Sequence, residues 1–264
     1  MSLTLTTHPN FVSSKKAIAD FLADFEHAGE YLTKGDRNVI KKATIDGVTI
    51  TIKKFKTPNF FQSLVYRYLR QSKAKRSFKY AIKLIESGIN TPFPVAFAER
   101  FNGGLKESYY LCEFVDYDID FRVLNHTPLY PNRDEILTQF ASFTFKLHEN
   151  NINFLDHSPG NTLIKISENN TYDFYLIDLN RMRFETMSLK KRMHNFRRMW
   201  LSKKMVRIMA AQYAILYNVP FAKVHGLMLS YSKEFQGKAN KRKLRKSGLL
   251  TGGDAAKVKK AISA

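Results

Sequence analysis

The sequence predicts an α+β fold, with strands concentrated before about residue 115 and helices dominating the rest. Before residue 115, β-branched residues recur on both sides of short turns that contain glycine. After residue 130, apolar residues recur at helical spacing, and only two short apolar runs typical of strands interrupt them. The chain of 264 residues is long enough for one large domain or for two smaller lobes.

The first part is expected to be a small sheet with one embedded helix, preceded by an extension at 1–30 that holds a short helix between Phe11 and Phe25. The turn at Asp46-Gly47 predicts a hairpin, because β-branched residues lie on both sides of it. A basic helix is expected from about Phe60 to Ser87, ended by Gly88. Two further strands are expected, Val95–Ala98 and Ser108–Val115, joined by a turn at Asn102-Gly103-Gly104.

The second part is expected to begin with an amphipathic helix, Arg133–His148. Strands at Thr162–Ile166 and Phe174–Ile177 follow, then helices through Met193–Tyr217 and Phe221–Tyr231. The basic tail from residue 233 is expected to be at least partly disordered. The domain boundaries predicted from these changes are 1–30, 31–115, 116–232 and 233–264.

Composition limits the class of protein. A hydrophobic fraction of 44% can fill a core, and the single Cys112 excludes both an intramolecular disulfide and a zinc site with several cysteines. Cys112 stands in an apolar run and is expected to be a buried thiol. There is no apolar run of the ~20 residues that a membrane span needs, and residues 1–10 lack a signal-peptide core, which favours a cytoplasmic protein.

The net charge is +20, from 43 basic and 23 acidic residues. Such an excess attracts polyanions, which include nucleic acid, phosphorylated glycolipid and an anionic membrane surface. Charge alone does not choose among them.

The chemically informative segment is the loop Asp156-His157-Ser158-Pro159-Gly160-Asn161, which lies between a helix and a strand. Asp178 follows the next strand, so the hairpin formed by the two strands should present Asn161 and Asp178 close together. Phosphoryl transfer needs one carboxylate to accept the hydroxyl proton and a set of oxygen ligands to hold Mg²⁺. Asp156 suits the first role, and Asn161 with Asp178 suits the second. The alternative is a plain surface turn, whose residue types are the same.

This spacing is similar to the catalytic loop and metal-binding Asp of protein kinases. A kinase also needs a strand lysine, and Lys53 lies on the same strand face as Thr49 and Thr51, with Lys54 as second choice. Gly35 and Arg37 are candidates for contacts with the phosphates of ATP in the preceding turn. Backbone groups from Glu113 to Val115 are candidates for binding adenine. An ordinary turn at Gly35 and a solvated lysine at position 53 remain the alternatives.

Several segments together resemble the lipopolysaccharide core kinases, the Kdo/heptose kinase family. They are Gly35-x-Arg37-Asn38-x-Ile40, Ile52–Lys56, Ser72–Phe78, Gly88–Ala96, Asp156–Asn161 and Ile177–Arg181, in family order over roughly 30–215. The resemblance implies a bilobal protein-kinase-like fold, ATP and Mg²⁺ as cofactors, and a sugar hydroxyl of the lipopolysaccharide inner core (lipid A-core precursor) as acceptor. It also implies peripheral attachment to the anionic, cytoplasmic face of the inner membrane.

The sequence departs from the kinase pattern in two places. Asp178-Leu179-Asn180 stands where protein kinases have Asp-Phe-Gly. The helix glutamate that pairs with the strand lysine is expected near Ser77 or Lys79, where no acid occurs, and Glu86 lies too close to the end of the helix.

Two other function classes remain open at this point. A catalytically silent pseudokinase scaffold is favoured by the missing glutamate, and a nucleic-acid-binding protein is favoured by the charge, although no nucleic-acid motif is present. The segment Met193–Leu201 mixes basic and apolar residues, so it is either a membrane-contacting helix or a core helix with a basic face. His148 and His157 are expected in structural roles rather than as metal ligands.

Overall fold

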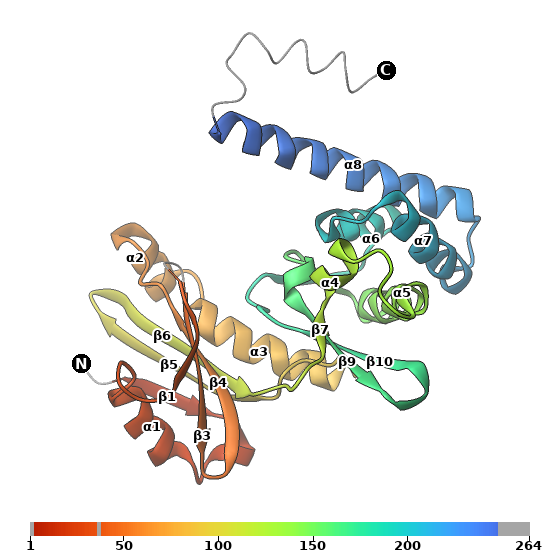
Figure 1. Ribbon diagram of the computed structural model, residues 1–264. Helices are drawn as coiled ribbons and strands as arrows, with labels where there is room; N and C mark the ends of the chain where they lie inside the picture. The colour runs from red at the N-terminus through yellow and green to blue at the C-terminus, as the bar shows by residue number, and fades with distance from the viewer. Residues whose placement is uncertain (1–2, 36–37, 248–264) are drawn as a thin grey trace. The chain divides into compact units, whose positions relative to one another are not determined.

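The computed structural model describes residues 3–35 and 38–247 (Figure 1). These residues form two compact units. Unit 1 holds the described residues up to Phe121 together with Asn161–Arg183. Unit 2 holds Arg122–Gly160 and the described residues from Phe184 onward. The segment with Asn161 and Asp178 therefore packs with the N-terminal part of the chain.

A six-stranded antiparallel sheet forms the centre of unit 1, in the order β1-β5-β6-β4-β3-β2. Its strands are β1 (Thr4–Thr7), β2 (Glu30–Lys34), β3 (Asn38–Ile45), β4 (Val48–Phe55), β5 (Pro94–Asn102) and β6 (Gly104–Glu113). The two expected hairpins are confirmed. Asp46 and Gly47, at φ 49° and 79°, make the first turn, and Gly103, at φ 70°, makes the second.

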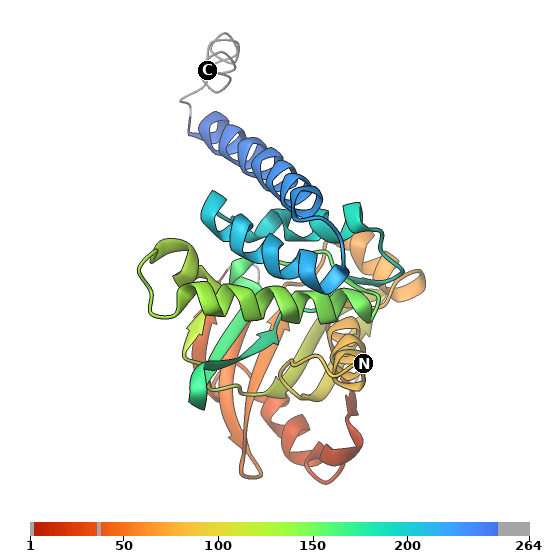
Figure 2. The same cartoon turned by 90° about the vertical axis from the view of Figure 1, so that its right-hand side faces the viewer.

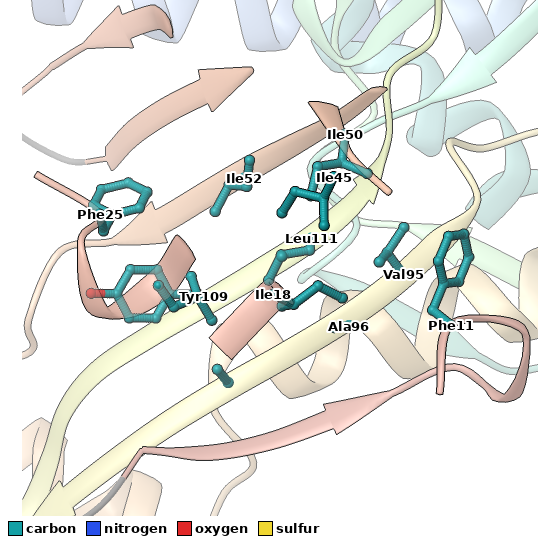
Figure 3. Close-up of a cluster of buried hydrophobic side chains, with 12 residues drawn as sticks. Phe11, Ile18, Phe25, Ile45, Ile50, Ile52, Val95, Ala96, Tyr109 and Leu111 are labelled. Carbon is teal, nitrogen blue, oxygen red and sulfur yellow. The ribbon is translucent and has the colours of Figure 1, made fainter. Parts of the chain in front are cut away.

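The two faces of this sheet carry different layers. One face holds a hydrophobic core that β4, β5 and β6 share with the N-terminal segment, which contains a short 3-10 helix (Pro9–Phe11) and α1 (Lys15–Ala23) (Figure 3). Ile50 and Ile52 point into this core, so the alternation along β4 turns Thr51 and Lys53 to the other face. That other face packs against α3 (Lys73–Glu86), through contacts such as Phe78 on Phe97. The segment before residue 31 is thus built into the sheet and its core.

A buried lysine fastens α1 to the sheet. The Lys41 side chain is fully buried, and its Nζ donates to the backbone oxygens of Phe25, Glu26 and Ala28 at 2.6, 3.1 and 2.8 Å. The ammonium also lies 4.0 Å from the centre of the Tyr31 ring. These carbonyls belong to the turn that follows α1, so the ammonium satisfies backbone acceptors that lie outside the helix and the sheet.

The single basic helix expected over Phe60–Ser87 is wrong, because the structure has two helices, α2 (Phe60–Tyr68) and α3. The Ser72 hydroxyl accepts a hydrogen bond from the Lys75 N–H at 3.0 Å and starts a new helix there. The expected end at Gly88 is confirmed, with φ 65° at that glycine.

A small second sheet in unit 1 carries the metal-site candidates. Its order is β10-β9-β7, with β7 (Ile119–Asp120), β9 (Thr162–Ser167) and β10 (Thr171–Leu176), and a 3-10 turn (Glu168–Asn170) joins β9 to β10. The loop after α3 holds this hairpin in place: the Leu176 N–H donates to the Asn90 oxygen at 3.1 Å, and Thr91 Oγ1 donates to the Leu176 oxygen at 2.7 Å.

Unit 2 is mainly helical, and α7 packs between α5 and α8 (Figure 2). Its helices are α4 (Phe121–His126), α5 (Arg133–Glu149), α6 (Leu189–Asn195), the 3-10 helix η4 (Phe196–Met199), α7 (Lys203–Tyr217) and α8 (Phe221–Lys246). β8 (Ile152–Phe154) also belongs to unit 2. A 3-10 turn (Pro159–Asn161) and β11 (Met182–Phe184) span the two points in the sequence at which the chain passes from one unit to the other. The amphipathic helix expected at Arg133–His148 is confirmed as α5.

The chain is helical over Met193–Tyr217 as expected, except for a break between Met199 and Lys203. Trp200 has a left-handed backbone, φ 56°, and the Ser202 hydroxyl then caps α7. Met193, Phe196 and Met199 are fully buried, so this segment is a core element, and its interpretation as a membrane-contacting helix is wrong. Helix α8 runs to Lys246, so regular structure reaches into the basic tail, while residues 248–264 lie outside the described residues.

The structure also bears on the predicted burial of Cys112 and on the search for a membrane-spanning helix. Cys112 is buried as expected, and burial raises the pKa of its thiol to about 12. Within residues 3–35 and 38–247, every helix is too short or too polar to span a bilayer.

Candidate active site

Lys53 and Asp178 form an ion pair in unit 1, with 2.8 Å between Nζ and Oδ1. Lys53 comes from β4, and Asp178 comes from the residues that follow β10. The Lys53 side chain is 14% exposed and the Asp178 side chain 30%, so the pair is shielded while the carboxylate stays open to a ligand. Lys53, predicted from the strand pattern, therefore contacts Asp178, predicted from the loop pattern, although the two residues are 125 positions apart in the sequence.

Asn161 and Asp178 are neighbours at the end of the β9–β10 ladder. The last strand pair is Thr162 with Leu176, and the Ile177 N–H donates to the Asn161 oxygen at 3.0 Å. Asp178 is the next residue and has a left-handed backbone, φ 59°, which ends the strand and which Asp tolerates better than most residues. The hairpin therefore brings an amide side chain and a carboxylate to one end, as the spacing predicts.

Asn180 orients the carboxylate of Asp178. Its Nδ2 donates to Asp178 Oδ1 at 2.7 Å, the same oxygen that Lys53 contacts. Among the described residues, none donates a hydrogen bond to the second oxygen, Oδ2. An oxygen left in this state is a suitable ligand for a hard cation.

Lys73, at the start of α3, adds positive charge near this pair. Burial lowers the pKa of Lys73, the nearby Arg181 and Lys53 lower it further, and Asp178 acts in the opposite direction. Lys73 belongs to the helix on which a glutamate was expected, and the carboxylate that Lys53 contacts is Asp178 itself. The cluster is rich in cations, which suits a polyphosphate ligand.

Gly35, Glu113 and Val115, which are also predicted to contact the nucleotide, lie in unit 1. Gly35 follows β2 in the β2–β3 hairpin, and its N–H donates to the Asn38 oxygen at 3.2 Å. Arg37 lies outside the described residues. The Glu113 N–H already donates to the Phe93 oxygen and the Phe114 N–H to the Thr49 oxygen. Of the predicted adenine-binding segment, Glu113 therefore cannot offer its N–H, and Val115 stays a prediction.

Asp156 lies in unit 2, where Arg198 from η4 contacts it with 2.8 Å between Nη2 and Oδ1. The Asp156 side chain is 19% exposed. The guanidinium also lies over the Phe235 ring of α8, at 5.7 Å from its centre, which fixes the position of the arginine. The arginine holds the Asp156 carboxylate in a defined orientation, which a general base needs.

A buried hydrogen-bond network supports the loop around Asp156. The Asn195 amide donates to Asn153 Oδ1 at 3.0 Å and to the Phe154 oxygen at 2.8 Å. Its Oδ1 must then accept, and it lies 2.8 Å from His157 Nδ1 and 3.3 Å from His148 Nε2. Burial lowers the pKa of His148 to about 3 and that of His157 to about 4, so both imidazoles are neutral. The structural role expected for the two histidines is confirmed.

Sequence reasoning missed the positioning residues Arg198, Asn180, Lys73 and Asn195. Asn180 has a short-range signal, since it stands two positions after Asp178 in a strand-ending turn. Arg198 and Asn195 have none, because each acts on a loop about 40 positions earlier in the chain.

The chemistry of the donor set fits a magnesium nucleotide. Asp178 and Asn161 offer carboxylate and amide oxygens, and Lys53 and Lys73 offer charge for phosphates. Clusters of three or more His, Cys, Asp or Glu side chains suited to a metal are absent from the part of the chain that the structure describes. The donors therefore match a hard cation shared with phosphates rather than a site enclosed by protein.

A family model described as the lipopolysaccharide kinase (Kdo/WaaP) family matches residues 33–219. This chain belongs to the lipopolysaccharide kinase (Kdo/WaaP) family. The resemblance inferred from its motifs is thereby confirmed. The family is one of kinases, so the chain is a phosphotransferase that uses ATP and acts on an alcohol group.

Comparison with a solved WaaP structure supports the same fold. A structure of WaaP in complex with acyl carrier protein has a TM-score of 0.61 at 16% identity, covering 90% of this chain and 99% of that one. A Rio2 kinase–ADP/Mg²⁺–phosphoaspartate complex from Chaetomium thermophilum has a TM-score of 0.46 at 14% identity, covering 88% and 75%. Comparison with curated proteins finds no match. The expected α+β, protein-kinase-like fold is confirmed for this lipopolysaccharide kinase family member.

Proposed function

We propose that this kinase transfers the γ-phosphate of ATP to a hydroxyl of Kdo or heptose in the inner core of lipopolysaccharide. The observation that carries the proposal is the Lys53–Asp178 ion pair beside Asn161, which joins the strand lysine to the hairpin carboxylate within one compact unit. Family membership supports the class of acceptor.

Each residue then has a defined task. Lys53 and Lys73 would attract and orient the phosphates, while Asp178 and Asn161 would hold Mg²⁺. Asn180 keeps the Asp178 carboxylate in one orientation, and Asp156 accepts the proton of the sugar hydroxyl while Arg198 fixes the position of its carboxylate. When bound, Mg²⁺ neutralises negative charge on the phosphates. Gly35, Arg37, Val115 and a backbone group of Glu113 other than its N–H remain proposed nucleotide contacts.

We further propose that the enzyme acts as a peripheral protein at the cytoplasmic face of the inner membrane. The net charge of +20 supports attraction to an anionic leaflet, where each basic residue near the surface contributes about 1 kcal/mol. The WaaP structure also contains an acyl carrier protein, and such a protein is a second partner to test for this chain.

The direct test is mass spectrometry of lipid A–core extracts from cells with and without the gene. The proposal expects the loss of one phosphate from a core fragment when the gene is removed, and fragmentation then identifies Kdo or heptose as the acceptor. Identical phosphate content in both extracts, with nucleotide binding retained by the purified protein, would favour the pseudokinase scaffold instead.

A further inference from the structure

Helix α2 exposes a stripe of large apolar side chains. Phe61, Val65 and Tyr68 follow one another at i, i+4 and i+7, and they are 78%, 40% and 70% exposed. Phe60 and Leu69 at the two ends are 69% and 83% exposed. A helix on a protein surface normally turns such a stripe inward, so its outward position in α2 requires another explanation.

The small and polar side of α2 faces the sheet. Ser63 is buried against Gly104 at the start of β6, where an added Cβ would lie 2.3 Å from Ser63 Oγ. Asn59 Oδ1 caps the helix by accepting from the Gln62 N–H at 2.9 Å, and Thr57 Oγ1 donates to the Lys106 oxygen at 2.8 Å. The helix is therefore formed and fixed with its apolar stripe facing outward.

A basic pocket lies at the C-terminal end of α2. Its volume is about 370 Å³, and its lining includes Tyr66, Arg67, Arg70, Lys75, Glu99 and Phe101. Burial, and then the proximity of Arg70, lower the pKa of the neighbouring Arg76, which shows that like charges crowd here. Within the described residues, Arg67, Arg70 and Lys75 form no ion pair, and the one acid in the lining is Glu99.

We propose that α2 is a membrane-docking helix that places its apolar stripe at the headgroup–acyl boundary of an anionic bilayer. The phosphate of an anionic lipid then binds Arg67, Arg70 and Lys75. Aromatic side chains beside cations are the combination that interfacial helices use. Tyr68 and Leu69 of the stripe also line the basic pocket, so apolar and cationic groups adjoin, and this charge complements the phosphates of an anionic bilayer. This inference deepens the proposed membrane location and does not depend on which sugar is phosphorylated.

The test is flotation of the full chain with vesicles of phosphatidylcholine alone or with added phosphatidylglycerol. Wild type should bind the anionic vesicles, and Phe61→Ser/Tyr68→Ser should weaken that binding by at least about tenfold. The matched control Val12→Ser/Leu129→Ser also removes two exposed apolar side chains, 61% and 93% exposed, and should bind as wild type does. Equal binding by the α2 variant and wild type would overturn the proposal.

A second pair of variants tests the pocket. Arg67→Glu/Arg70→Glu should lose about tenfold or more on anionic vesicles and little on neutral ones. Lys15→Glu/Lys233→Glu changes the net charge equally at exposed sites elsewhere and should lose clearly less. An equal loss in both variants would mean that net charge, and not this pocket, attracts the bilayer, which contradicts the proposal.

Two more measurements separate the alternatives. Phosphate transfer to a deacylated, soluble core oligosaccharide should be the same for wild type and Phe61→Ser/Tyr68→Ser, because the stripe lies outside the proposed catalytic groups. If neither protein transfers phosphate, the proposed function fails while the vesicle result still decides the docking. Binding to purified acyl carrier protein that depends on the stripe, with vesicle binding unaffected, would make α2 a protein-docking helix and overturn the membrane proposal.

Discussion

Asn195 links three segments of unit 2 through one buried amide, which is 2% exposed. It donates to Asn153 and Phe154 of the segment that leads to Asp156, and it accepts from His157, the residue after Asp156. His148 completes the network by contacting the Tyr213 hydroxyl with Nδ1 at 2.9 Å. The position of the proposed catalytic base therefore depends on a residue that cannot touch the substrate.

Asn195→Ala should destabilise unit 2 by about 3 kcal/mol or more, because it leaves buried donors on two histidines without an acceptor. Denaturant unfolding measures this loss. The control Asn150→Ala, at the exposed end of α5, should cost less than about 1 kcal/mol. A similar loss in both variants would show that the network contributes little.

The buried histidines also make stability depend on pH. Their pKa values of about 3 and about 4 lie below the ordinary 6.5, so between pH 6.5 and 4 the unfolded chain binds more protons than the folded one. Stability contributed by each neutral histidine is complete above pH 6.5 and falls by about 1.4 kcal/mol per pH unit below it. For His157→Gln, the unfolding free energy should depend less steeply on pH between pH 7 and 5, by an amount that corresponds to about one proton. Denaturation curves at several pH values measure this slope. An unchanged slope would mean that His157 is protonated in the folded state.

At the scale of elements, Lys41 decides whether the N-terminal segment stays on the sheet. Lys41→Met keeps the length of the side chain and removes the donors to three carbonyls, so unfolding should become easier by about 3 kcal/mol. The melting temperature should fall by roughly 6–12 °C. Lys42→Met, the next residue, whose ammonium lies over the Phe114 ring, should cost about 1 kcal/mol or less. Equal melting temperatures for wild type and Lys41→Met would contradict the role given to this lysine.

Local signals predicted the hairpins, the end of α3 and the α5 helix. Turn glycines and alternating β-branched residues act within a few positions, and so does the β9–β10 ladder that brings Asn161 to Asp178. The breaks before Ser72 and Ser202 were missed, because basic and apolar residues continue at helical spacing across both. A serine cap is a weak signal beside such a run.

Long-range contacts explain the rest of what the sequence did not reveal. No local pattern indicates that Lys41 is buried or that Arg198 contacts Asp156. The sequence likewise does not predict which face of α2 is exposed, because an apolar stripe normally predicts burial. The contact of Ser63 with Gly104 shows which side faces the sheet. The kinase pattern predicts the carboxylate partner of Lys53 on a helix, whereas this partner is Asp178, which follows β10 in the same unit.

At the scale of the whole molecule, the proposed reaction needs residues from both units. Lys53, Asn161 and Asp178 belong to unit 1, and Asp156 belongs to unit 2, only five positions before Asn161 in the sequence. The net charge of +20 and the α2 surface would serve the same reaction if the acceptor is carried in a membrane.

The most direct test of this account is phosphate transfer from ATP labelled at the γ position to a purified lipid A–core acceptor, measured for wild type and for Asp156→Asn. The substitution keeps the shape of the side chain and removes the base, so the rate should fall by about 10²–10⁴-fold while ATP affinity stays within about threefold. Asp46→Asn, in a turn whose left-handed backbone suits asparagine, is the matched control and should keep full activity. Transfer by Asp156→Asn at the wild-type rate would contradict the assignment of the catalytic base.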